Sequence, residues 1–313
     1  LPDRGHGISL APDGRSLVVV ARRPGRWAAV FALPDLRLLH RLDLPAGRHF
    51  YGHGCFTPDG ARFLTTENDT DGGDGIVGVW DVRRGWARIA ERRSGGVGPH
   101  DLAITADGRH LVVANGGIRT HPDTGRDILN RDTMHPTLAL LALDRDEVLA
   151  TADLGRDLRP SSIRHLAVAP DGEVVFGCQF EGEAEVMPPL VGVWRPDRPG
   201  RAPVLWDMPD AALARLADYV GSVALDASGA TVAATSPRGG ATAFFDRRSG
   251  AWIGVADLPD VCGVAADGDG FLLTSGAAGI RRADRIAAHT ALVDPHPGFA
   301  ATAWDNHLTR LPR

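Results

Sequence analysis

The sequence predicts an all-β fold, a seven-bladed β-propeller with four strands per blade around a central channel. Two observations predict it: one hairpin pattern occurs six times, and most copies are followed by a second pair of short apolar runs. Self-similarity every few tens of residues is typical of repeat proteins. Radial repetition of four-stranded sheets describes a propeller of the WD40 or YVTN kind.

Each copy of the hairpin contains an apolar run, a tight turn and a second apolar run that ends in a polar residue. The copies begin at His6, His53, His100, His165, Ser222 and Val261. Their turns read Pro-Asp-Gly, Ala-Asp-Gly or Ala-Ser-Gly, residues that favour tight turns. Residues 78–81 and 86–90 are an example of the outer strand pair that follows.

The repeats divide the chain into blades at about 1–47, 48–96, 97–155, 156–211, 212–257 and 258–295. We expect the two ends to form the seventh blade, with one strand near residues 299–308 and another from the N-terminus. Closing the ring in this way removes exposed strand edges. Since no linker separates halves, we expect residues 1–313 to form a single domain.

Composition excludes several classes of protein. The 313 residues carry a formal net charge of −5 and no long basic run, so nucleic acid is not expected as a partner. No apolar run approaches the roughly 20 residues of a membrane span. All 34 basic residues are arginine, which excludes mechanisms that use lysine. Cys55, Cys178 and Cys262 lack metal-site spacing, so we expect buried free thiols.

The predicted architecture brings polar residues of different blades to one mouth of the channel. Residues just before the first strand and just after the second strand of every blade meet there. Four histidines precede the first strand at matched positions: His6, His53, His100 and His165. Glu67, Asn115 and Gln179 end the second strand of three blades. This convergence is the strongest functional signal in the sequence.

Imidazole nitrogen and carboxylate oxygen together suit a first-row transition metal ion. We expect a metal site formed by His53, Glu67, His100 and His165, with His6 and His121 as further donors. The alternative is that each histidine hydrogen-bonds a neighbouring blade. Glu67 has no arginine neighbour in the sequence, so its burial would require a cation or an arginine from elsewhere in the fold.

Arginines and amides form a second set of candidate ligand-binding residues. They are Arg22, Arg48, Arg164, Arg238, Asn115 and Gln179. Guanidinium groups bind carboxylates through two parallel hydrogen bonds, so this set would hold a small anionic co-ligand. The alternative is a set of salt bridges within the protein. Two long connections, residues 67–75 and 116–137, complete the polar features, and the second is predicted to cap the channel.

Several segments resemble a known family. They include Gly-Arg-His-Phe-Tyr-Gly-His-Gly at 47–54, Val-Ala-Asn-Gly-Gly at 113–117, Thr-His-Pro at 120–122 and Thr-Ser-Pro-Arg-Gly at 235–239. Together they resemble, over nearly the whole chain, the bacterial propeller family catalogued as domain of unknown function 1513. The resemblance implies export by the twin-arginine pathway, and so a periplasmic location. It also implies a genetic setting beside imelysin-type iron-uptake proteins, but no reaction.

The function expected from residues and resemblance is a periplasmic metal-binding propeller that binds or hands on iron. Copper and zinc are the other candidate metals, and periplasmic iron-uptake proteins are the expected partners of a monomer. One alternative is a metal-dependent lyase, hydrolase or oxidase that uses the same site. Another is a docking platform without catalysis. No hydrolase signature such as G-x-S-x-G is present.

Overall fold

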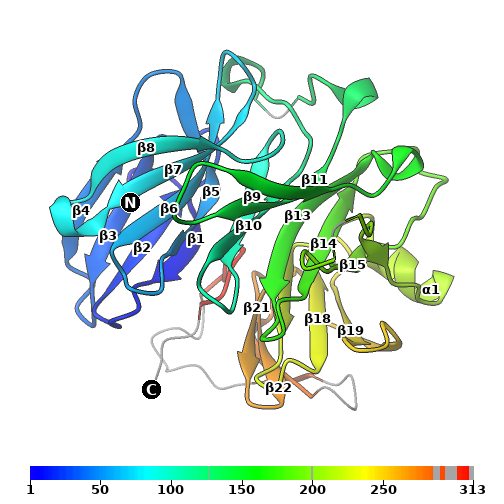
Figure 1. Cartoon of the computed structure of the whole chain (residues 1–313). Helices are drawn as coiled ribbons and strands as arrows, with labels where there is room; N and C mark the ends of the chain where they lie inside the picture. The colour runs from blue at the N-terminus through cyan, green and yellow to red at the C-terminus, as the bar shows by residue number, and fades with distance from the viewer. Residues whose placement is uncertain (126, 199, 285–289, 293–301, 310–313) are drawn as a thin grey trace. The chain divides into compact units, whose positions relative to one another are not determined.

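The computed structural model describes residues 1–125, 127–198, 200–284, 290–292 and 302–309. The chain forms two compact units, Leu1–Ile163 and Arg164–Arg310. Both consist of four-stranded antiparallel sheets in which consecutive strands are neighbours (Figure 1). The predicted all-β propeller with four-stranded blades is therefore confirmed, whereas the prediction of a single domain stays a prediction.

The first unit contains three blades, each a meander of four strands. The first blade is β1 (Gly5–Leu10), β2 (Ser16–Ala21), β3 (Trp27–Ala32) and β4 (Leu38–Asp43). The second blade is β5 (Arg48–Phe56), β6 (Arg62–Asp69), β7 (Gly75–Asp81) and β8 (Ala87–Arg93). The third blade is β9 (Pro99–Ile104), β10 (His110–Asn115), β11 (Thr137–Ala142) and β12 (Val148–Ala152). Short 3-10 turns lie at Val82–Arg84, Pro122–Thr124, Arg131–Thr133 and Arg156–Leu158.

The other three blades follow in the same order. The fourth blade is β13 (Ser161–Val168), β14 (Val174–Phe180), β15 (Val191–Trp194) and β16 (Val204–Leu205). The fifth blade is β17 (Ser222–Leu225), β18 (Thr231–Ser236), β19 (Ala241–Asp246) and β20 (Trp252–Asp257). The sixth blade is β21 (Val261–Asp267), β22 (Gly270–Ser275), β23 (Gly279–Ala283) and β24 (Thr290–Leu292). A one-turn helix, α1 (Asp210–Leu213), and a 3-10 turn, Ala214–Leu216, precede β17.

The prediction of seven blades is wrong for the described residues, which form six four-stranded sheets. The N-terminal strand β1 pairs with β2 and completes the first blade, so it is not available to a further one. Residues 302–309 form no strand, and residues 299–301 of the predicted terminal strand lie outside the described residues. The sequence-based count assigned the ends to an extra blade because each end resembles a strand.

The hairpin turns explain why the repeat is visible in the sequence. The glycine of each turn has a positive φ of similar size: 68° at Gly14, 65° at Gly60, 69° at Gly108, 83° at Gly172, 70° at Gly229 and 63° at Gly268. Glycine adopts this left-handed conformation without steric cost. In the second and third blades, a threonine hydroxyl also donates to the turn aspartate, at 2.7 Å from Thr57 and 2.6 Å from Thr105.

The middle strands of a blade are more buried than its outermost strand. All six residues of β11 are buried, whereas β12 at the edge of the same sheet has no buried residue. Between the first two blades, apolar side chains such as Val30, Phe50 and Phe63 form one cluster at zero exposure. The middle strands are thus fixed by packing on both faces.

The remaining sequence predictions concern thiols and the membrane. The three cysteines are free, and burial raises the pKa of the Cys55 and Cys178 thiols. A raised pKa keeps these two thiols protonated and unreactive. In the part of the chain that the structure describes, no helix combines the length and apolar character needed to cross a membrane.

The second blade buries a carboxylate on its second strand. Glu67 of β6 is fully buried, and its carboxylate accepts a hydrogen bond from Thr65 at 2.6 Å and pairs with Arg88 of β8. Trp80 of β7 donates to the same Thr65 hydroxyl at 3.0 Å. Burial raises the pKa of the Glu67 carboxyl, and Arg88 and Thr65 act against that shift. Arg88 is therefore the arginine partner that the sequence left open.

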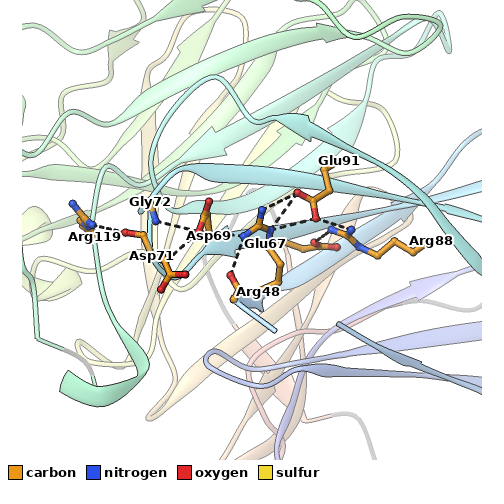
Figure 2. Close-up of polar contacts among 9 residues, drawn as sticks. Arg48, Glu67, Asp69, Asp71, Gly72, Arg88, Glu91 and Arg119 are labelled. Carbon is orange, nitrogen blue, oxygen red and sulfur yellow. Dashed lines mark hydrogen bonds and ion pairs between the residues drawn. The ribbon is translucent and has the colours of Figure 1, made fainter. Parts of the chain in front are cut away.

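Further ion pairs extend this contact across the blade (Figure 2). Arg88 also pairs with Glu91 at 2.7 Å, and Glu91 pairs with Arg48 of β5 at 3.0 Å. Arg48 in turn pairs with Asp69 at 3.1 Å. Burial acts to raise the pKa of Glu91, but hydrogen bonds from Arg48 and Arg88 outweigh it and hold the pKa below its usual value. The chain of charges thus joins the innermost and outermost strands.

Removing the cation from the buried pair should destabilise the protein. In Arg88→Ala the Glu67 carboxylate stays buried without its partner, so we expect the free energy of unfolding to fall by about 3–5 kcal/mol. Arg84→Ala is the control, since the Arg84 side chain is 79% exposed and its pair with Asp81 spans 3.6 Å; its loss should be below about 1 kcal/mol. Urea denaturation measures both, and equal losses would contradict a stabilising role for the buried pair.

Candidate functional site

Three histidines of the first unit lie together. His6 comes from β1, His53 from β5 and His100 from β9, the innermost strands of three successive blades. The ring centroids are 4.9 Å apart for His6 and His53, 5.2 Å for His53 and His100, and 5.7 Å for His6 and His100. His53 is the common member: one of its ring nitrogens lies within 4.8 Å of a nitrogen on His6, and one of its ring nitrogens lies within 4.8 Å of a nitrogen on His100. We call these three residues the histidine cluster.

Each member of the histidine cluster lies in a β-bulge. The sequence placed the histidines before the first strand, whereas the structure places them inside it, at points where the pairing with the second strand slips. The slips fall between Gly5 and Ile8 of β1, between Phe50 and Gly54 of β5, and between Pro99 and Asp101 of β9. A bulge bends its strand and redirects a side chain. The same irregularity in three blades therefore turns three histidines toward one place.

Two glycines allow the close approach of β1 and β5 at this point. A Cβ on Gly7 would lie 2.6 Å from the carbonyl oxygen of Gly52 and 3.1 Å from Nδ1 of His53. A Cβ on Gly52, which has a φ of 119°, would overlap the His6 ring. Only glycine fits both positions without moving a histidine. The glycines beside the histidines are the sequence signal for these bulges.

Polar contacts fix the orientation of His53. Its Nδ1 lies 3.3 Å from Oδ1 of Asp101, and its side chain is 11% exposed. Its main-chain N–H donates to the Thr66 hydroxyl at 3.3 Å, and that hydroxyl lies 3.2 Å from its carbonyl oxygen. A carboxylate at Nδ1 favours the neutral tautomer with its hydrogen on Nδ1, which leaves the lone pair on Nε2. His53 therefore presents Nε2 as an electron-pair donor.

Glu67 is directed elsewhere. Adjacent residues of a strand point to opposite faces, and Thr66 occupies the face that contacts His53. Glu67 faces Gly78 of β7, on which a Cβ would overlap its carboxylate, and it pairs with Arg88. That Glu67 is a metal ligand stays a prediction, and the structure shows its carboxylate paired with Arg88. We leave Glu67 out of the site proposed below.

The second unit contains a histidine pair of its own. His165 of β13 is 3% exposed, and its ring centroid lies 5.0 Å from that of His307. His121 lies in the connection between β10 and β11, where its Nδ1 accepts the main-chain N–H of Asp123 at 3.2 Å. That His121 and His165 share a metal with the histidine cluster stays a prediction.

The polar residues that end the second strands have structural hydrogen bonds. Asn115 is fully buried. Its Oδ1 accepts a hydrogen bond from the Ser94 hydroxyl at 2.6 Å, and its Nδ2 donates to the Ser94 carbonyl at 3.1 Å and to the Thr137 hydroxyl at 3.2 Å. Ser236 and Ser275 likewise donate to main-chain carbonyls of the connection preceding their own blade, at 2.6 Å and 2.5 Å. Gln179 donates to Glu181 at 2.5 Å. Because these hydrogen bonds lie within the protein, we do not include Asn115 or Gln179 in the site.

The candidate arginines are dispersed. Arg48 belongs to the chain of ion pairs in the second blade (Figure 2). In the second unit, the Arg238 guanidinium lies over the Tyr219 ring at 4.9 Å, a cation–π contact, and Arg164 adjoins His165 on β13. The main-chain N–H of Arg22 donates to the carbonyl of Arg4 at 3.1 Å. An anionic co-ligand bound by Arg22, Arg164 and Arg238 stays a prediction.

Filling the space beside Gly7 should displace the cluster. In Gly7→Ala the new methyl group meets main chain and the His53 ring, so we expect the ring resonances of His6 and His53 to shift in NMR spectra and the free energy of unfolding to fall by about 1–3 kcal/mol. Gly14→Ala is the control: its φ is 68°, and nothing lies within 4 Å of its Cβ. It should lose about 1 kcal/mol through backbone strain and leave both histidines unchanged. Unshifted histidine resonances in Gly7→Ala would contradict the close approach.

Comparisons with known proteins agree with this architecture. The model of a family described as "Protein of unknown function (DUF1513)" matches residues 1–311. Among solved structures, hydrazine synthase of Kuenenia stuttgartiensis is similar, with a TM-score of 0.66, 15% sequence identity, and coverage of 90% of this chain and 83% of that chain. At that identity the likeness shows the fold alone. No curated protein has a matching sequence. Because the family model spans residues 1–311, the chain belongs to the DUF1513 family of β-propeller proteins.

Proposed function

We propose that this protein binds a first-row transition metal ion through the histidine cluster of His6, His53 and His100. The convergence of three imidazoles from three bulged inner strands carries the proposal. Imidazole is the commonest side-chain ligand of such metals. The cluster is also supported on a rigid scaffold, since each histidine comes from a strand packed within the unit.

The surroundings of His53 support a role as metal ligand. Histidines that bind metals commonly donate the hydrogen of their other ring nitrogen to a carboxylate, which fixes the ring and raises its basicity. Asp101 occupies this position at 3.3 Å from Nδ1 of His53. His100 is 5% exposed, so a metal bound there would be shielded from water on that side.

The donor set bears on which metal binds. Without Glu67 the cluster offers three nitrogens and no carboxylate oxygen, a set for which divalent ions follow the order Fe(II), Co(II), Ni(II), Cu(II), with Zn(II) weaker than Cu(II). We therefore expect Cu(II) and Zn(II) to bind more tightly than Fe(II) in vitro. Iron remains the physiological candidate on the resemblance to the exported family, and with it a periplasmic role in binding or handing on iron.

Three imidazoles leave coordination positions open. An open position admits water, a co-ligand or a further protein donor. An open coordination position favours a carrier that takes up and releases its metal ion. It equally suits an enzyme that activates metal-bound water. The enzymatic candidate rests on this feature alone. If no metal binds, the alternative function is a docking platform for other proteins.

Removal of two cluster histidines tests the proposal. We expect the wild-type protein, after anaerobic loading with Fe(II), Cu(II) or Zn(II) and desalting, to retain about one metal ion per chain, and His53→Ala/His100→Ala to lose affinity by at least about 100-fold. Elemental analysis and competition with a chelator measure this. His110→Ala is the control, because His110 lies on β10 and pairs with Asp107. Equal metal contents in the double variant and the control would rule out the cluster as the site.

Asp101 should tune the affinity through His53. Asp101→Asn retains an oxygen near Nδ1 but removes the negative charge, so we expect metal affinity to fall by about 10-fold, within the range typical of such outer partners. The free energy of unfolding should change by less than about 1 kcal/mol, as measured by urea denaturation. An unchanged affinity would show that the Asp101 charge does not reach the metal.

A further inference from the structure

A cavity lies in the first unit between two long connections, the one from β6 to β7 and the one from β10 to β11. Its volume is about 680 Å³. Thr70 and Asp71 line it from the first connection, and Arg119, His121 and Asn130 from the second. All five side chains carry hydrogen-bonding groups, so the cavity suits a small polar ligand.

Specific hydrogen bonds hold the walls of this cavity. Nη2 of Arg119 donates to the carbonyl oxygen of Asp71 at 3.1 Å and so joins the two connections (Figure 2). The main-chain N–H of Arg119 donates to Oδ1 of Asn130 at 2.7 Å, and Nδ2 of Asn130 donates to the carbonyl of Gly117 at 2.8 Å. The cavity is thus a built feature of the connection predicted to cap the channel.

Arg119 brings an uncompensated positive charge to the cavity. In the described part of the chain, its guanidinium bonds only the Asp71 carbonyl and has no carboxylate within ion-pair distance. A guanidinium has five N–H donors in a planar fork, and one bond to a carbonyl leaves most of them available. This geometry matches a carboxylate, which accepts two parallel hydrogen bonds.

His121 adds a second donor. Its Nδ1 accepts the main-chain N–H of Asp123 at 3.2 Å. A neutral imidazole that accepts at Nδ1 carries its hydrogen on Nε2, so His121 is a donor there. The Asp123 carboxylate lies 3.5 Å from Nδ1, but that side chain is 87% exposed and screened by water.

A buried histidine of β5 interacts electrostatically with Arg23 and His121. His49 is 2% exposed. Burial lowers its pKa, and the Arg23 guanidinium lowers it further. His49 is therefore neutral near pH 7, and the charge of Arg23 favours an anion nearby.

One lining group has the opposite character. Asp71 places a carboxylate in the same cavity, and among the described residues that carboxylate receives no hydrogen bond. A carboxylate accepts hydrogen bonds and repels negative charge. It therefore disfavours a ligand with several negative charges and favours one that carries a hydroxyl or an ammonium group.

We propose that this cavity binds a small monocarboxylate with a hydroxyl or amino group on the adjacent carbon. Arg119 and His121 hold the carboxylate of the ligand, and Asp71 accepts a hydrogen bond from its hydroxyl or amino group. The proposal does not rest on metal binding, because none of these three residues belongs to the histidine cluster.

Titration with small probes tests the proposal. Glycolate, glycine, acetate and inorganic phosphate would each be titrated into the full chain and followed by NMR. We expect glycolate and glycine to bind more tightly than acetate, and phosphate to bind least. Arg119→Gln should weaken glycolate binding by about 10- to 100-fold, the effect of losing a charge-assisted hydrogen bond. Arg84→Gln, an exposed arginine of the same unit, should change nothing.

Two further variants separate binding from folding. Because Arg119 also joins the connections, His121→Phe provides a second removal of a donor, with an expected loss of about 10-fold. Asp71→Asn should leave acetate binding in place and abolish the preference for glycolate and glycine. No binding of glycolate or glycine at millimolar concentration, tighter binding of phosphate, or unchanged glycolate affinity in both Arg119→Gln and His121→Phe would each overturn the proposal.

Discussion

The close contact of neighbouring inner strands is the constraint on which the histidine cluster depends. β1 packs against β5, and β5 against β9, so side chains at matched positions of successive blades come close only if the backbones approach closely. Gly7 and Gly52 permit that approach, and the bulges redirect the rings. A regular ladder would send successive side chains to alternate faces of each blade. The bulges instead insert one extra residue in β1 and in β9 and two in β5, which interrupts that alternation. In this way a repeat that serves packing also forms a site.

Buried charge has a structural role in both units. In the first, Glu67 pairs with Arg88 from the outermost strand of its blade. In the second, Glu173 is 3% exposed and pairs with Arg195 and Arg247, both at 2.6 Å. A buried carboxylate without a partner would cost several kcal/mol, roughly, so a paired arginine is the simplest solution. Since this pairing uses Glu67, the histidine cluster is left with nitrogen donors and Asp101 beside them. The pairing with Arg88 explains why Glu67 is not among the donors of the histidine cluster.

The sequence was sufficient for the blades because the turn glycines and the two apolar runs are local features that recur. It was insufficient for the blade count, since a strand-like tail such as residues 299–308 looks the same in sequence whether or not it pairs into a further sheet, and only pairing decides. It located His6, His53 and His100 but not their bulges, because register depends on the partner strand. It could not show that Glu67 pairs with Arg88, because that partner lies two strands away in the sheet. The cavity at Arg119 was not foreseen, since it forms where two connections far apart in sequence meet.

The two candidate sites of the first unit differ in what fixes their geometry, and this limits what each can recognise. The histidine cluster lies on inner strands of neighbouring blades that contact one another. Its spacing is therefore set by the blades and suits a ligand defined by size and coordination, such as a metal ion. The cavity lies on connections, and its donors are held by hydrogen bonds between Arg119, Asn130 and Asp71. Recognition there depends on charge and hydrogen-bond pattern. The scaffold thus supports a geometric site on its strands and an electrostatic site on its loops, and neither requires the other.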